Sequence, residues 1–320
     1  MTRFDCHQHL WPGEFVAALR ARQHHPYLRD WTLFLPGENP YRVDPAAHDV
    51  AGRMGRENSD RVLLSLSSPL GIEHLPGHDA AGLIDVWHES ALRLPGFFHV
   101  WAAAPVTAPD PGALAEVLRE PRIAGLQLPA TALGDPAAIE RMSPLLAELE
   151  RAGKPLLVHP GPATVEDGEL PDWWAAVVPY VNQLHRSWAA WHVAGRKWHA
   201  NLRVGFVALA GLAPLHHERM AARGGDLGTP DPHVFYETSS YGPEAISALT
   251  GVVGRDAIVH GSDLPYAQPL DRKLFPAEFF TTNPARLLSV SAAESGPGSV
   301  PRPAGGSADP GGSAPPGRRG

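Results

Sequence analysis

Two histidines separated by one residue stand near the start of the chain, where they could share one ligand. His7 and His9 lie in residues 3–9, a segment that we expect to form a β-strand. Side chains two residues apart on a strand point to the same face. A chain with 17 histidines contains about one such pair by chance, so the spacing carries little weight and position has to decide.

Two further residues with metal-binding side chains stand at the ends of other expected strands. His159 ends residues 155–159, and Asp263 ends residues 257–263. Three imidazoles and one carboxylate are a ligand set that suits Zn²⁺ or a similar divalent ion. Such an ion can lower the pKa of bound water to roughly 7 and can polarise a substrate oxygen. If the four side chains meet, the chemistry that they support is metal-assisted.

These side chains can meet only if the segments that carry them lie side by side, and the pattern of the whole chain predicts such an arrangement. Short aliphatic or β-branched runs alternate with longer helical patterns, which is typical of βαβ units and a parallel sheet. The expected strands are residues 3–9, 61–67, 96–102, 123–128, 155–159, 203–209, 234–238 and 257–263. Helical patterns are expected near residues 47–58, 77–94, 111–119, 135–152, 172–200, 214–223, 243–253 and 276–290.

Local signals define the ends of several of these helices. Asp110 is a good N-cap because a proline follows it at the first helical turn. Gly153 has the residue type that commonly follows the last turn of a helix. Pro179 is expected to break or kink the helical region 172–200, because proline lacks the backbone N–H that a helix interior needs.

Eight strand–helix repeats favour a closed barrel over an open doubly wound sheet. An open sheet would more often carry a Gly-rich phosphate loop after its first strand, whereas this chain continues with LWPGEF. In a parallel barrel the functional side chains lie at the carboxyl ends of the strands. The sequence therefore predicts one α/β domain, a (β/α)₈ TIM-like barrel over residues 1–290. Residues 291–320, rich in Gly, Pro, Ser and Ala, are expected to form a disordered tail.

Composition excludes several classes of partner. The formal charge of −7 argues against nucleic acid and against an anionic membrane surface, because both need a basic face. Cys6 is the one cysteine of the chain, so an internal disulfide cannot form. The first residues do not read as a secretory signal, and no apolar stretch approaches the ~20 residues of a membrane span. We therefore expect a cytoplasmic protein that acts on a small molecule, with homo-oligomer formation left open.

Five short motifs follow one another along the chain. They are D-x-H-x-H-L near the start, L-V-H-P in the middle, V-F-Y-E-T-S-S, G-S-D-L-P-Y, and N-P-A-R-L-L in the closing helix. Together they resemble the amidohydrolase-related family, which includes aminocarboxymuconate-semialdehyde decarboxylase-like and resorcylate decarboxylase-like enzymes. The resemblance spans about residues 3–290 and implies a distorted (β/α)₈ barrel. It also implies that the metal ligands are His7, His9, His159 and Asp263.

The chain departs from the family pattern at two positions. Gln127 stands where binuclear members of the wider superfamily have a carboxylated lysine. A glutamine cannot be carboxylated, so this residue favours a single metal ion. We expect that ion to be Zn first, with Mn as the alternative. Leu209 stands where the family has a histidine at the end of the sixth strand. A leucine cannot transfer a proton. His216 or its neighbour His217 could therefore take over that role.

The resemblance leaves two reactions and one non-catalytic alternative open. We expect first a metal-dependent hydrolase that acts on a small organic molecule, with aromatic or unsaturated carboxylates among the candidate substrates. Asp263 would be a metal ligand and the general base. Non-oxidative decarboxylation on the same site is the second expectation. The third is a barrel that binds a ligand without turnover, which the missing histidine motivates. Trp11 and Glu237 are the candidate residues of the substrate pocket.

Overall fold

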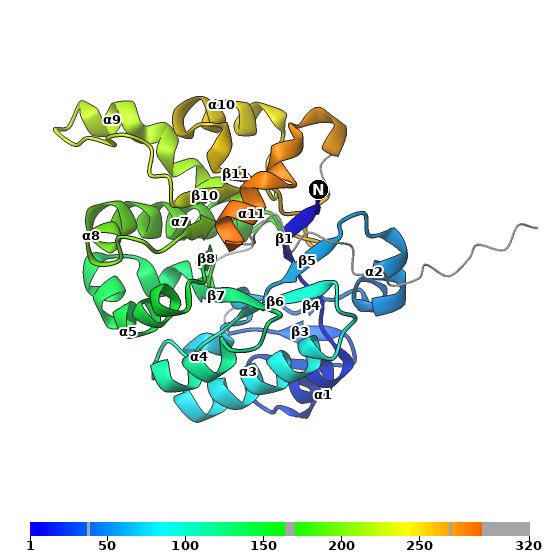
Figure 1. Ribbon diagram of the computed structural model, residues 1–320. Coiled ribbons are helices and arrows are strands. Elements are labelled where there is room, and N and C mark those ends of the chain that lie inside the picture. The colour runs from blue at the N-terminus through cyan, green and yellow to red at the C-terminus, as the bar shows by residue number, and fades with distance from the viewer. Residues whose placement is uncertain (37–38, 164–169, 269–270, 290–320) are drawn as a thin grey trace, which may run out of the picture.

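The protein is built around an eight-stranded parallel sheet that curls into a barrel (Figure 1). The computed structural model describes residues 1–36, 39–163, 170–268 and 271–289. The strands are β1 Phe4–Gln8, β5 Arg61–Leu64, β6 Phe98–Ala102, β7 Ile123–Pro129, β8 Leu156–His159, β9 Val204–Phe206, β10 Val234–Glu237 and β11 Ile258–Val259. Neighbouring strands pair in chain order, which confirms the predicted (β/α)₈ architecture.

The first and last strands meet along a seam that closes the ring. The backbone N–H of Cys6 donates to the carbonyl of His260 at 2.9 Å, and that of His9 donates to the carbonyl of Leu264 at 2.7 Å. The backbone N–H of Asp263 donates to the carbonyl of His7 at 2.9 Å. The seam therefore fixes the segment after β11 directly against the end of β1.

Helices surround the strands and bury their outer faces (Figure 1). They are α1 Gly13–Ala21, α2 Val50–Arg56, α3 Gly77–Leu92, α4 Pro111–Val117, α5 Pro136–Ala152, α6 Trp174–Val177, α7 Pro179–Ala190, α8 Arg196–Trp198, α9 His217–Ala221, α10 Pro243–Val253 and α11 Thr282–Leu288. The local signals are confirmed. Asp110 accepts from the N–H of Ala113 at 3.0 Å, Gly153 is left-handed with φ of 64°, and α7 begins at Pro179.

Residues 10–60 contain structure that the sequence pattern did not predict. After helix α1, three short strands form an antiparallel sheet of their own, β2 Tyr27–Arg29, β3 Thr32–Phe34 and β4 Tyr41–Arg42. The helix expected near residues 47–58 is present as α2. It is the one element of this region that the sequence pattern predicted. The small sheet and α1 are an insertion between the first two strands of the barrel.

The predicted tail, residues 291–320, lies outside the described residues. Within the described part of the chain, no helix is long and apolar enough to cross a membrane.

Candidate metal centre

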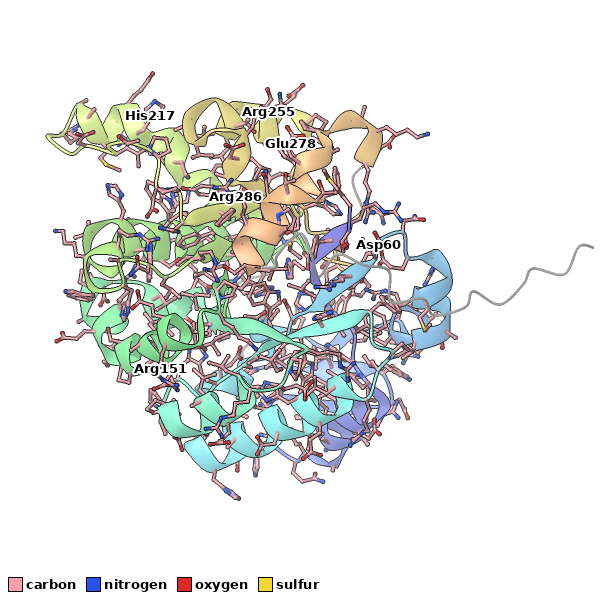
Figure 2. The ribbon with its side chains drawn as sticks, in the orientation of Figure 1. Asp60, Arg151, His217, Arg255, Glu278 and Arg286 are labelled. Atoms are coloured by element: carbon pink, nitrogen blue, oxygen red, sulfur yellow. The ribbon has the colours of Figure 1, made fainter. Side chains whose placement is uncertain are left out.

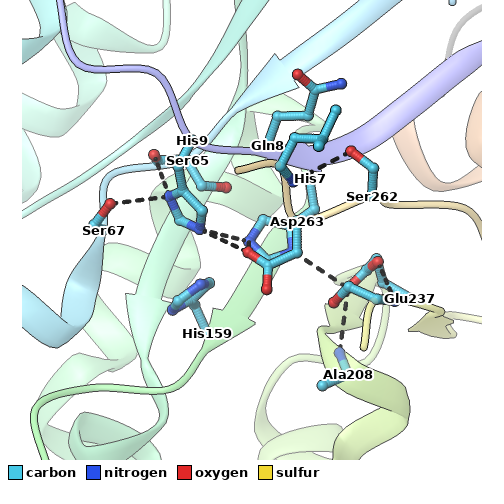
Figure 3. A network of polar contacts seen from close by, with 12 residues as sticks. His7, Gln8, His9, Ser65, Ser67, His159, Ala208, Glu237, Ser262 and Asp263 are labelled. Carbon is cyan, nitrogen blue, oxygen red and sulfur yellow. Dashed lines mark hydrogen bonds and ion pairs between the residues drawn. The ribbon is translucent and has the colours of Figure 1, made fainter. Parts of the chain in front are cut away.

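Three histidines gather in the barrel interior at the carboxyl ends of their strands (Figure 3). His7 is on β1, His9 follows it directly, and His159 is the last residue of β8; each is at most 5% exposed. One ligand nitrogen from each imidazole lies within 4.8 Å of the other two. The structure thus brings together three side chains that the strand-end argument expected to meet.

Asp263 reaches the same place from the segment after β11. Its Oδ1 lies 3.2 Å from His9 Nε2 and 3.8 Å from His7 Nε2. The backbone of Asp263 is left-handed with φ of 55°, a conformation that aspartate adopts more readily than most residues. This turn, together with the seam hydrogen bond to His7, points the carboxylate at the imidazoles.

Each imidazole is oriented by a hydrogen bond between its Nδ1 and an oxygen atom of a neighbouring group. Nδ1 of His9 lies 3.0 Å from the carbonyl of Ser65, and Nδ1 of His159 lies 2.8 Å from the carbonyl of Pro160. Nδ1 of His7 lies 3.3 Å from Oε2 of Glu237. Carbonyl and carboxylate oxygens only accept hydrogen bonds, so each Nδ1 donates. Each Nε2 is then left as the atom with a free lone pair, which is the arrangement that metal-binding histidines use.

The spacing of these lone pairs fits a bound cation. Nε2 of His7 and Nε2 of His9 are only 3.0 Å apart. Two lone pairs at that distance repel each other unless a proton or a metal ion lies between them. In their neutral form, three imidazoles together with one carboxylate are a donor set for Zn²⁺ or Mn²⁺. The residues present therefore fit a single divalent metal ion.

Burial keeps two of the imidazoles neutral. It lowers the pKa of His9 and that of His159 well below their ordinary value, and the charge of His7 adds to the effect on both. Burial also acts to lower the pKa of His7, but the hydrogen bond to Glu237 and the charge of Asp263 outweigh it, so that pKa is raised. Burial raises the pKa of Asp263, opposed by the charges of His7 and His159.

Glu237 stands behind His7. It is fully buried. In addition to the contact with His7, it accepts from the backbone N–H of Ala208 at 3.2 Å (Figure 3). It also accepts from the backbone N–H of Ser239 at 2.6 Å. The Ser239 hydroxyl donates to the same carboxylate at 2.7 Å. These contacts are those of a carboxylate that orients the His7 imidazole. The role of Glu237 in the substrate pocket stays a prediction.

Trp11, the other candidate pocket residue, is also buried. Its indole N–H donates to the Ser67 hydroxyl at 3.1 Å, and that hydroxyl lies 3.2 Å from His9 Nδ1. The indole ring stacks on His48 with 4.7 Å between ring centroids. Trp11 therefore packs behind His9, and a role in the pocket stays a prediction.

His216 and His217, the expected replacements for the missing histidine, lie elsewhere. His216 is exposed, and its ring lies edge-on to that of His185, 5.1 Å away. Nδ1 of His217 donates to the carbonyl of Pro214 at 3.2 Å, and Figure 2 shows this residue on α9 at the periphery of the molecule. Among the contacts of the described residues, neither imidazole reaches the cluster. Their acid–base role stays a prediction that these positions do not support.

Leu209 itself is buried in an unusual backbone segment. Five consecutive residues after β9 are left-handed, with φ between 46° at Ala208 and 66° at Leu212. Non-glycine residues pay roughly 1–2 kcal/mol each for this conformation. The N–H of Ala208 bonds to Glu237, and the carbonyl of Gly211 accepts from His185 Nε2 at 2.6 Å. The segment therefore supports Glu237 with its backbone, while Leu209 offers no group for proton transfer.

A chain of buried polar groups joins Gln127 to Ser68 and Glu73, two residues that the sequence analysis did not single out. Gln127 Nε2 donates to the carbonyl of Leu66 at 2.7 Å and to the hydroxyl of Ser68 at 2.8 Å. The Ser68 hydroxyl donates in turn to Glu73, which is fully buried. Burial raises the pKa of Glu73 to about 7. The serines of the S-L-S-S run after the second strand were the sequence signal that could have pointed to this loop.

Comparisons with known proteins show the fold. No protein-family model and no curated protein sequence matches the chain. Among solved structures it is similar to IDCase of Metarhizium anisopliae, with a TM-score of 0.74 at 16% identity, covering 90% of this chain and 97% of that chain. It is also similar to the protein named amidohydrolase II, with a TM-score of 0.67 at 16% identity, covering 90% of this chain and 100% of that chain.

A third neighbour carries ligands. It is 5-carboxyvanillate decarboxylase of Novosphingobium aromaticivorans, complexed with manganese and 4-hydroxy-3-methoxy-5-nitrobenzoic acid. Its TM-score is 0.65 at 17% identity, and the match covers 90% of this chain and 96% of that chain. The similarity to these structures confirms the barrel fold that the resemblance implied.

Proposed function

We propose that this protein is a metal-dependent enzyme of the amidohydrolase-related type that removes CO₂ from a small aromatic or unsaturated carboxylic acid. The observation that carries the proposal is the buried cluster of His7, His9 and His159 beside Asp263. The named decarboxylase among the structural neighbours, which holds manganese and a substituted benzoic acid, supports the reaction class and the substrate class.

In this reaction the histidines would bind the metal ion and Asp263 would supply the proton. The three imidazoles would hold the ion, and the carbonyls of Ser65 and Pro160 keep two of them in the required orientation. A divalent ion bound there would polarise oxygen atoms of the substrate. The bond between the substrate carbon and its carboxylate would break, CO₂ would leave, and the electron pair would stay on that carbon. A proton from the Asp263 carboxyl would then form the new C–H bond, which leaves Asp263 as a carboxylate.

Hydrolysis, the first expectation from the sequence, is the second candidate. The same donor set can serve it, and the neighbour named amidohydrolase II supports keeping it. It is the weaker candidate because hydrolysis needs a group that activates water. The position where the family has a histidine holds the buried Leu209, so Asp263 would have to do this alone.

A substrate panel separates the two reactions. Protein loaded with Zn²⁺ or Mn²⁺ is given hydroxybenzoic and unsaturated carboxylic acids, esters, lactones and amides, and both CO₂ release and hydrolysis are scored. We expect CO₂ release from at least one acid. Asp263→Asn should lower that rate about 10²-fold or more, because it removes the proton carrier. Asp256→Asn changes an exposed aspartate outside the cluster and serves as the matched control.

The outcomes are distinct. Turnover of an ester, lactone or amide with no CO₂ release from any acid would replace decarboxylation by hydrolysis. A rate in Asp263→Asn equal to that in Asp256→Asn would contradict the role of Asp263 in either reaction.

A further inference from the structure

Residues 65–68, which follow β5 at its carboxyl end, form the loop that orients the His9 imidazole (Figure 3). The carbonyl of Ser65 accepts from His9 Nδ1 at 3.0 Å, and the Ser67 hydroxyl lies 3.2 Å from the same nitrogen. The backbone N–H of Ser65 donates to the carbonyl of Gln8 at 2.8 Å, which ties the start of the loop to β1. The direction of the imidazole therefore depends on how firmly the rest of the 65–68 loop is held.

Gln127 of β7 points into the barrel toward this loop. It pairs in register with Leu157, which lies two residues before His159 on β8. Side chains two residues apart on a strand point to the same face, so Gln127 and Leu157 face the barrel interior as His159 does. In the sheet, β6 lies between β7 and β5. The Gln127 side chain therefore spans the end of one strand to reach the 65–68 loop.

The amide group of Gln127 holds the loop at two points. Its Nε2 donates to the carbonyl of Leu66 at 2.7 Å and to the hydroxyl of Ser68 at 2.8 Å. Gln127 is completely buried, so water does not compete for these bonds. The consecutive carbonyls of Ser65 and Leu66 are thus bonded to two different side chains, His9 and Gln127. The backbone between these two carbonyls has little freedom to turn.

Trp11 also contacts the loop, but it does so through a side chain. Its indole N–H donates to the Ser67 hydroxyl at 3.1 Å. A hydroxyl group rotates to suit its partners, so this bond does not fix the direction of the backbone. The bond from Gln127 acts on a backbone carbonyl instead, one residue away from the carbonyl that orients His9.

We propose that Gln127 is a positioning residue of the metal centre, which acts on the ion through the 65–68 loop and the imidazole of His9. This inference rests on the metal centre of the proposed function. Loss of a direct partner of a metal-bound histidine commonly lowers metal affinity 10–100-fold. Gln127 lies one contact further from the ion, so we expect an effect at the lower end of that range, about tenfold.

Gln127→Met tests this role, because methionine has a similar length and no N–H donor. The Zn²⁺ affinity is measured by competition with a chelating dye, with no substrate present. Asn283→Leu is the matched control. The buried Asn283 Nδ2 also donates two bonds, to the carbonyls of Arg255 at 2.9 Å and Ile258 at 2.7 Å. Ile258 begins β11, so this control loses the same kind of bond at the end of the barrel away from the histidines.

We expect Gln127→Met to bind Zn²⁺ about tenfold more weakly than the wild type, and Asn283→Leu to bind it as the wild type does. The same proteins are loaded with Co²⁺, whose visible absorption depends on the geometry of its ligands. The absorption bands should change in Gln127→Met and stay unchanged in Asn283→Leu. A residue that only stabilised the fold would leave both the affinity and the bands of the folded protein unchanged.

Ser68→Ala is the second variant, and it decides the question if Gln127→Met does not fold. It removes one of the two acceptors and keeps Gln127 bonded to Leu66, so Zn²⁺ binding should weaken by a smaller factor, about threefold.

Affinities and Co²⁺ bands of Gln127→Met and Ser68→Ala equal to those of Asn283→Leu would overturn the role of Gln127 and leave the metal centre in place. A wild type that binds neither Zn²⁺ nor Co²⁺ would overturn the metal centre, and this inference with it.

Discussion

At the scale of single residues, the candidate metal centre depends on what lies behind the imidazoles as much as on the imidazoles themselves. His9 and His159 each donate from Nδ1 to a backbone carbonyl, and His7 donates to the carboxylate of Glu237. A carboxylate partner raises the basicity of a histidine ligand more than a carbonyl does. His7 is therefore the candidate ligand whose basicity depends on another side chain.

The buried carboxylic acid of Glu73 should make stability depend on pH. Burial raises the pKa of Glu73 from its ordinary value of 4.5 to about 7. The folded protein therefore holds a proton that the unfolded chain has released between these values, and wild-type stability falls as the pH rises through this window. Glu73→Gln does not titrate and can still accept from Ser68. It should be roughly 2–4 kcal/mol more stable than the wild type at pH 8, and the gain should shrink toward pH 4.5.

Urea unfolding of both proteins between pH 4.5 and pH 8 measures this difference. Glu140→Gln, at an exposed position of α5, is the control and should show no comparable gain. A Glu73→Gln gain that stays constant over the whole range would mean that Glu73 does not change its protonation there.

The residues of the cluster could be proposed from the sequence, but their partners could not. His7, His9 and His159 were placed by alternation along a strand and by the rule that barrel sites lie at strand ends. The carbonyl of Ser65 and the carboxylate of Glu237 meet them only because of how the strands are staggered in the sheet. A single sequence carries no direct record of that stagger.

At the scale of elements, two neighbouring strand ends together support His7, one of the candidate metal ligands. Gly261, just after β11, lies against Glu237 at the end of β10, so that a Cβ at this glycine would stand 2.2 Å from Glu237 Oε1. Gly261→Ala should therefore displace the carboxylate from His7 and weaken metal binding by about 10–100-fold, the usual effect of losing such a partner.

Competition with a chelating dye measures the metal affinity of this variant. Gly251→Ala, in helix α10, is the matched control, because a Cβ there has no atom within 4 Å. Alanine is also the better helix former, so this control should fold at least as well as the wild type. A Gly261→Ala affinity equal to that of Gly251→Ala would show that Glu237 does not support the metal ligand.

The elements that could not be predicted from the sequence have one physical property in common, which is that local residue preferences do not specify them. Strands β2 and β3 have three residues each and β4 has two, too short for alternation to show. The left-handed run from Ala208 to Leu212 contains only one glycine, so residue type gave no warning of it. Both features are imposed by the packing around them, and local preference does not specify either.

At the scale of the whole molecule, alternation of strands and helices was sufficient to predict the barrel. All eight strands were expected within a few residues of their observed bounds, and they pair in chain order. Closure of the ring then brings the end of β1 against the segment that carries Asp263. Side chains more than 250 positions apart in sequence, such as His7 and Asp263, become neighbours as a consequence of the fold alone.

The most direct test of the account is the metal content of the protein, purified without chelator, dialysed after loading with Zn²⁺ or Mn²⁺, and measured by mass spectrometry of the elements. We expect about one equivalent in the wild type and in His216→Ala, which changes an exposed histidine outside the cluster. His159→Ala should retain less than about a tenth of an equivalent. Equal metal content in His159→Ala and the wild type, or a wild type that retains no metal, would contradict the central claim.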